Sequence, residues 1–314
     1  PKVYHIDTNA QTATDMEAEK TETGDVAVAT DHFSMYDISL VAARELSSTS
    51  TIGKDTFKDG GEFRLTGDVR TADNANLSIK QNTTIDLNGH TLTISKANQF
   101  FDVHEGAKLT IMDSKAPQET VSDASGDIYG NKATLENDTL TYYITTSTPA
   151  GTGTTETLVK HEVPLTGAGK ILCQEASEQV ILVKGTLELQ SGVLQNTGGK
   201  HIVLVDRGTL DINGGYIVGG GSNGTPGGGI YVDNGTVNIQ GGVIAANRGS
   251  SGGGIFFQNG TLNISGGAVT GNWLNDGHDN GGGIYFQDGT LNLSGGYVTN
   301  NRKECDCNDC KNDV

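Results

Sequence analysis

The sequence predicts an all-β protein folded as a parallel β-helix, and three observations lead to this prediction. Glycine provides 45 of the 314 residues, whereas proline provides only 5. A Gly-Thr-Leu/Val triplet recurs from Gly185 onwards at intervals of 23, 27, 25 and 29 residues. Each triplet opens a short apolar–polar–apolar run, which is the period of two expected of a strand with one buried face. Such short strands bury their apolar faces only if successive coils stack on one another.

Two aliphatic columns run through the aligned repeats and define the expected interior. They contain Leu187, Leu210, Val237, Leu262 and Leu291, and then Leu189, Ile212, Ile239, Ile264 and Leu293. Polar residues separate the two columns in every repeat, and no apolar stripe at helical spacing accompanies them, so helical solenoids are excluded. With coils about 4.8 Å apart, roughly ten coils would form a rod about 45–50 Å long.

The repeats resemble the right-handed parallel β-helix (pectate-lyase-like) repeat proteins of bacterial surfaces. The similarity rests on the strings IDLNGHTL (85–92) and LTIMDS (109–114) and on the GGGIY…GTLNISGG repeats. It covers about residues 60–301. The resemblance implies a right-handed β-helix and an extracellular or cell-surface setting in bacteria. It implies little about activity, because such repeats occur in adhesins, in host-interaction proteins and in scaffolds of larger surface proteins.

The chain is expected to have four parts. Residues 1–32 are polar and acidic and are expected to form a flexible segment. Residues 33–59 contain a short amphipathic run and are expected to cap the first coil. The β-helix occupies residues 60–314, with its clearest coils at 185–301, and the parent protein is expected to continue beyond Val314.

An inserted arm is expected at residues 118–166. Two β-rich runs, at 139–145 and 155–163, are joined by a segment with Pro149 and two glycines, which is the pattern of a hairpin. The arm is either a surface loop or a recognition element, since long insertions in compact domains are often functional. Its candidate contact residues are Tyr142 and Tyr143.

A further column holds aromatic residues and is expected to face outward. It contains Ile181, Leu204, Tyr231, Phe256 and Tyr285, and it lies between two columns of aliphatic and Phe residues that alternation directs inward. A row of aromatic rings on a flat sheet face suits sugar rings or a protein partner. The alternative is that the inserted arm or a neighbouring subunit covers this face.

The longest coil loop, residues 272–280, is another candidate contact. It contains the only tryptophan of the chain, Trp273, together with His278. Asp276 and Asp279, with neighbouring carbonyl groups, offer oxygen ligands for Ca²⁺, although their spacing matches no standard calcium loop. Plain solvation of the loop is the other interpretation.

Enzymatic activity has one candidate pair of residues. Asp206 and Asp233 fall in one column of the repeat alignment, so they are expected to lie about 4.8 Å apart on neighbouring coils, as a hydrolase would need. The same column continues as glutamines, which favours a polar ladder. A polyuronate lyase is disfavoured because Arg248 is the only basic residue between Thr209 and Asn301.

Charge and cysteine content limit the partners further. The formal net charge of −17 disfavours nucleic acid, and no apolar run of 18 residues is present that would insert into a membrane. Cys173 is expected in the core. Cys305, Cys307 and Cys310 leave a disulfide, a free thiol and a metal site open. The sequence thus favours a surface or secreted scaffold that binds a host glycan, glycoprotein or immunoglobulin, with a glycoside hydrolase and a passive stalk as alternatives.

Overall fold

The computed structural model describes most of the chain from residue 42 onwards. The described residues are 42–72, 76–95, 99–124, 133–149, 154–174, 179–222, 224–274 and 281–303, together with the backbone of Ala150, Gly153 and five strands between residues 2 and 39. The chain divides into two compact units, Pro1–Arg44 and Glu45–Val314. All regular secondary structure in the described residues is β-strand.

The first unit contains two small antiparallel sheets. One has the order β2-β1-β5, and in the other β3 pairs with β4. The strands of this unit are β1 (Lys2–Asp7), β2 (Thr12–Met16), β3 (Ala18–Lys20), β4 (Val26–Val28) and β5 (Tyr36–Ser39). The flexibility expected for residues 1–32 stays a prediction.

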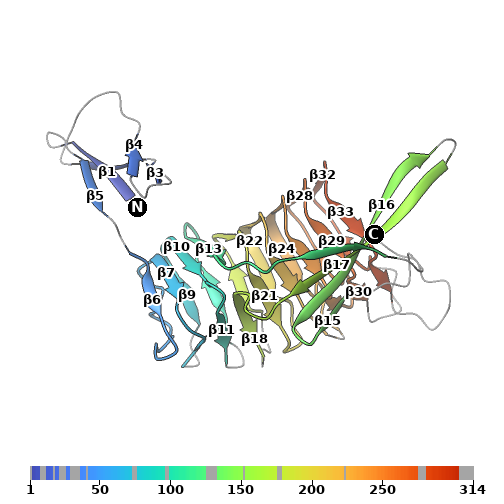
Figure 1. Cartoon of the computed structure of the whole chain (residues 1–314), viewed down its shortest axis with the longest axis horizontal. Coiled ribbons are helices and arrows are strands. Elements are labelled where there is room, and N and C mark those ends of the chain that lie inside the picture. Colours follow the sequence, from blue (N-terminus) through green and yellow to red (C-terminus); the bar gives the residue numbers. More distant parts are fainter. Residues whose placement is uncertain are drawn as a thin grey trace. The chain divides into compact units, whose positions relative to one another are not determined.

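The second unit is a parallel β-solenoid, as the sequence predicts (Figure 1). One side of it is a fourteen-stranded sheet in which the order β31-β27-β24-β22-β20-β13-β10-β7-β6 is flanked by five further strands. Its members are β6 (Arg44–Leu46), β7 (Gly61–Leu65), β9 (Leu77–Ile79), β10 (Thr83–Asp86), β12 (Phe101–Val103), β13 (Lys108–Met112), β19 (Ile181–Val183), β20 (Thr186–Leu189), β22 (Val203–Ile212), β24 (Ile230–Ile239), β27 (Ile255–Phe257), β28 (Thr261–Ile264), β31 (Ile284–Phe286) and β32 (Thr290–Leu293).

An eight-stranded sheet forms the second side and receives one strand from each coil. It consists of β8 (Val69–Arg70), β11 (Thr91–Ile94), β18 (Lys170–Cys173), β21 (Val193–Asn196), β23 (Tyr216–Val218), β25 (Val243–Ala245), β29 (Ala268–Thr270) and β33 (Tyr297–Thr299). A short three-stranded sheet of β26 (Arg248–Gly249), β30 (Trp273–Leu274) and β34 (Arg302–Lys303) follows it in the last coils. The solenoid therefore has about eight turns. Roughly ten coils were expected, so the sequence overestimated their number.

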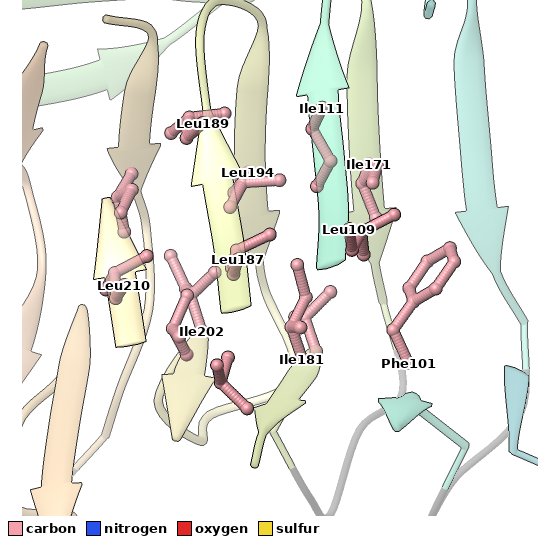
Figure 2. Packing of buried hydrophobic residues seen from close by; sticks show 14 of the residues in the cluster. Phe101, Leu109, Ile111, Ile171, Ile181, Leu187, Leu189, Leu194, Ile202 and Leu210 are labelled. Carbon is pink, nitrogen blue, oxygen red and sulfur yellow. The ribbon is translucent and has the colours of Figure 1, made fainter. Parts of the chain in front are cut away.

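The interior is a continuous column of apolar side chains. The predicted columns are confirmed by the register, since Leu187 pairs with Leu210, Leu210 with Val237, and Val237 with Leu262. Figure 2 shows the labelled aliphatic residues of neighbouring coils converging on this interior. Cys173 lies there as well and is fully buried. At the first coil the interior contains Phe57, whose ring lies 4.8 Å from that of Phe63.

The triple glycines make room for neighbouring backbone. A Cβ atom at Gly228 would lie 2.2 Å from the carbonyl oxygen of Arg248, and one at Gly253 would lie 2.5 Å from that of Trp273. These contacts are far below any allowed separation, so only glycine permits strands β26 and β30 to lie against the next coil. The repeated glycine triplets of the sequence are therefore a packing requirement of the short three-stranded sheet.

A ladder of buried asparagines follows the eight-stranded sheet. The Asn247 amide Nδ2 donates to Oδ1 of Asn272 at 3.0 Å, and the Asn272 Nδ2 donates to Oδ1 of Asn301 at 3.0 Å. Each side chain also donates to a carbonyl of the preceding turn, as Asn272 does to Ile244 at 2.8 Å. The ladder thus satisfies backbone groups where the chain bends away from the sheet.

The inserted arm is a four-stranded antiparallel sheet with the order β14-β17-β16-β15. Its long hairpin pairs β16 with β17 along their whole length, which is the hairpin that the sequence predicts. Its strands are β14 (Thr120–Asp123), β15 (Thr134–Glu136), β16 (Thr139–Ala150) and β17 (Gly153–Pro164). The arm crosses the outer face of the eight-stranded sheet, where Leu140 and Val163 pack in one apolar cluster with Val193, Val218 and Val243.

The asparagine ladder leads to a stability prediction. Replacing Asn272 with Ala leaves the Ile244 carbonyl and the Asn247 amide buried without their partner, so the free energy of unfolding should fall by about 2 kcal/mol or more. Urea denaturation followed by circular dichroism measures the change. Asn292→Ala removes a similar bond from an exposed residue of the fourteen-stranded sheet and should cost less than about 0.5 kcal/mol. Equal losses in both variants would contradict the role given to the buried ladder.

Candidate functional site

The aromatic row faces outward on the fourteen-stranded sheet. Tyr231 pairs in register with Phe256, and Phe256 with Tyr285, and all three side chains are partly exposed. The residue before them in this column is Leu204, and the one before that is Leu182. The assignment of Ile181 to this column is wrong, because Ile181 is fully buried in the interior.

The rings of this row stack on one another. The ring centroids of Tyr231 and Phe256 lie 5.1 Å apart with the planes inclined by 11°, and those of Phe256 and Tyr285 lie 5.3 Å apart at 28°. The spacing follows from the distance between parallel strands, which sets one ring above the next. The Tyr231 hydroxyl donates to Oε1 of Gln258 at 2.8 Å, and partial burial followed by nearby Asp233 raises the Tyr231 pKa.

His201 extends the stack by one ring, and sequence reasoning missed it. Its ring lies 5.5 Å from Tyr231 at 26°, and both ring nitrogens are buried without a hydrogen-bond partner. Burial, followed by the charge of Lys200, lowers the pKa of His201 to about 4, so the imidazole is neutral at pH 7. The sequence did mark this position as unusual, because Lys200-His201-Ile202 occupies the repeat position at which each of the next coils has three glycines.

The stacking determines which surfaces of the rings remain available. Tyr231 lies between His201 and Phe256, and Phe256 lies between Tyr231 and Tyr285, so both faces of these two rings are occupied by neighbours. The row therefore presents ring edges and the Tyr231 hydroxyl rather than open faces. We call this surface, formed by His201, Tyr231, Phe256 and Tyr285, the aromatic ladder. The arm packs on the eight-stranded sheet, whereas the aromatic ladder lies on the fourteen-stranded sheet.

The two tyrosines predicted as contacts on the arm serve other roles. Tyr142 is 3% exposed, so the prediction that it meets a partner is wrong. Its hydroxyl donates to Glu119, its ring stacks on His161 at 4.6 Å, and burial followed by the Glu119 hydrogen bond raises its pKa. Tyr143 is partly exposed, but its carbonyl accepts hydrogen bonds from Thr270 at 2.5 Å and from Asn300 at 2.9 Å. Both residues therefore help to hold the arm on the solenoid.

Trp273 also belongs to the seam between arm and solenoid. It is partly buried and packs against the apolar cluster beneath the arm, and the Arg248 guanidinium lies 5.9 Å from its ring centre. Trp273 is thus partly exposed at the edge of this cluster, and the contact role expected from the sequence stays a prediction. His278, Asp276 and Asp279 lie outside the described residues, as do Cys305, Cys307 and Cys310. Within the described part of the chain, no three His, Cys, Asp or Glu side chains gather as metal ligands would.

The candidate carboxylate pair is not in register. Asp206 pairs with Asn234 rather than with Asp233, because a register shift follows Val205. The shift coincides with a left-handed residue, Arg207 at φ 62°, where the next coil instead bends at Gly235. The Arg207 guanidinium binds the Asp206 carboxylate at 2.9 and 3.3 Å, so this acid is engaged in an ion pair. The prediction of a stacked Asp206–Asp233 dyad is wrong.

The class of the protein follows from the fold. It is a parallel β-solenoid repeat protein with an antiparallel arm packed across one sheet. Comparison with protein families, curated proteins and solved structures gave no match for the chain. Among the described residues, no helix has the length and apolar character needed to cross a membrane.

The neutral His201, whose two ring nitrogens are buried, leads to a prediction of pH dependence. The unfolded chain gains a proton on this residue below pH 6.5, whereas the folded chain resists protonation until about pH 4. The free energy of unfolding should therefore fall as the pH falls from 6.5 to 4, by up to about 3 kcal/mol from this residue. His201→Phe continues the stack without a titrating group, so urea unfolding at several pH values should show a shallower decline in the variant. Identical slopes would contradict the assignment.

Proposed function

We propose that this chain is a rigid binding scaffold of a bacterial surface or secreted protein, and that it recognises a host protein through the aromatic ladder. The bacterial, extracellular setting rests on the resemblance of the repeats to surface β-helix proteins. The binding role rests on one observation, which is the partly exposed row of stacked aromatic side chains on a sheet that the arm leaves uncovered.

The geometry of the ladder favours a protein surface over a sugar ring. Stacking of a sugar on an aromatic side chain requires an open ring face, and the faces of Tyr231 and Phe256 are occupied. Ring edges and a tyrosine hydroxyl form instead a flat, mixed apolar and polar strip. Tyrosine-rich strips of this kind are typical of protein interfaces, because they supply contact area with little loss of conformational entropy. Immunoglobulins and the protein part of glycoproteins are the partners that fit.

The solenoid itself supports such a role. Every coil is fixed by backbone pairing to its neighbours, so the ladder is ordered before a partner arrives and binding costs little side-chain entropy. A glycoside hydrolase has less support, because Asp206 is paired with Arg207 and stands out of register with Asp233. A passive stalk remains the alternative if the ladder captures nothing.

Capture of immobilised proteins tests the proposal. Surface plasmon resonance with immunoglobulin G and with mucin, each intact and enzymatically deglycosylated, should detect binding to at least one of them. Binding should survive deglycosylation, because ring edges contact protein. Tyr231→Leu/Phe256→Leu keeps apolar volume on the sheet but removes the ring edges, and should weaken capture about tenfold or more.

A matched control is provided by Tyr297, which is 44% exposed on the eight-stranded sheet. Tyr297→Leu should leave capture unchanged, and urea denaturation should confirm that both variants fold. Loss of binding on deglycosylation would show sugar recognition and overturn the protein-binding mode. Equal binding by wild type and ladder variant would remove the ladder from the interface, and silence toward all four surfaces would favour the stalk.

A further inference from the structure

The outer face of the eight-stranded sheet changes character along the solenoid. Beneath the arm its outward residues are mostly small or apolar, including Val193, Val218, Val243 and Ala245. In the first three strands, which the apolar cluster under the arm does not reach, the same register positions are mostly polar or charged. They are occupied by Asp68, Thr91 and Lys170, and by Arg70, Thr93 and Leu172.

These first strands form the floor of an open hollow. Its volume is about 430 Å³, within the range of small-ligand sites. We call it the N-terminal groove. It is lined by Val69 and Leu172, by hydroxyl groups of four residues, and by three longer polar side chains, namely Ser48, Ser50, Thr91, Thr93, Asp68, Arg70 and Gln174. The serines come from the turn that precedes the first complete coil, so the groove has a wall as well as a floor.

Arg70 is the one cationic residue that lines the groove among the described residues. It is exposed, and it takes part in none of the ion pairs that the described residues form with one another. Asp68, two residues earlier on the same face, is already engaged. Its Oδ1 accepts a hydrogen bond from the Thr91 amide at 2.8 Å and lies 3.6 Å from Nδ1 of His90. In a chain with a net charge of −17, an exposed arginine that pairs with no described carboxylate offers its guanidinium to an anion.

We propose that the N-terminal groove binds a carboxylated sugar. The Arg70 guanidinium offers the paired N–H donors that hold a carboxylate through two parallel hydrogen bonds. Thr91, Ser48 and Ser50 can donate to and accept from sugar hydroxyls, and the second Asp68 oxygen accepts from one of them. The partly exposed Leu172 side chain on the floor of the groove suits the C–H face of a pyranose ring.

The same charges define what the groove excludes. A neutral sugar offers no carboxylate to Arg70, and a polymer with many sulfates meets an acidic chain with a single described cation, Arg70, lining the groove. One carboxylate among several hydroxyls is therefore the best complement, as in a uronic acid or a sialic acid. This site is independent of the aromatic ladder, which lies on the other sheet.

Calorimetric titration with small probes tests the proposal. D-glucuronate and N-acetylneuraminate represent the two sources of a carboxylated pyranose, and D-glucose and acetate separate the contributions of hydroxyls and charge. We expect at least one acidic sugar to bind about tenfold more tightly than either glucose or acetate. Which of the two binds identifies the source. Arg70→Gln should weaken that binding about tenfold, and Arg70→Lys should weaken it less because charge is kept and only the fork is lost.

Two controls keep the test decisive. Arg207→Gln removes a surface arginine that already pairs with Asp206 and should leave the affinity unchanged. Thr91→Val preserves shape and removes one partly exposed hydroxyl, so it should weaken the sugar but not acetate. Equal affinity for acetate and the acidic sugars would show a simple anion site and overturn the proposal. So would equal affinity for glucose, an Arg70→Gln variant that binds like wild type, or no binding of either acidic sugar at about 10 mM.

Discussion

Parallel pairing between successive coils governs where every repeated side chain of the solenoid lies. Each strand is hydrogen-bonded to the strand one turn earlier and one turn later, so equivalent residues lie above one another. This produces aliphatic columns inside, an asparagine ladder at the bend and an aromatic ladder outside. Residues of one type that recur at the same repeat position therefore form a continuous strip along the solenoid. Local departures matter for the same reason, since one shift after Val205 separates Asp206 from Asp233.

The arm divides the solenoid surface into parts with different tasks. Where it packs, the outward positions of the eight-stranded sheet are mostly small or apolar, and Tyr142 and Trp273 are drawn into the seam. Beyond the apolar cluster under the arm, the same sheet carries the N-terminal groove with Arg70 exposed. The fourteen-stranded sheet keeps its aromatic ladder open on the other side. The insertion, for which a surface loop was one interpretation of the sequence, thus determines which sheet faces are available for binding.

The two proposed sites differ in how they would recognise a ligand. The aromatic ladder is flat, shows ring edges and depends on contact area, which suits a protein surface. The N-terminal groove is concave and polar and contains one exposed guanidinium, that of Arg70, which suits a small acidic molecule. Both are set on backbone that the neighbouring coils hold in place, so their geometry exists before any partner binds.

Period-two alternation, glycine spacing and turn residues predicted the solenoid, its inward columns, the outward aromatic row and the hairpin between β16 and β17. These are local signals repeated along the chain. Other features came from the folded chain: Tyr142 and Trp273 are fully or partly covered, the ladder includes His201, its rings stack on one another, and Arg70 lines a groove. Each of these depends on where the arm folds back and on side-chain packing between coils, and neither is encoded in the repeat period.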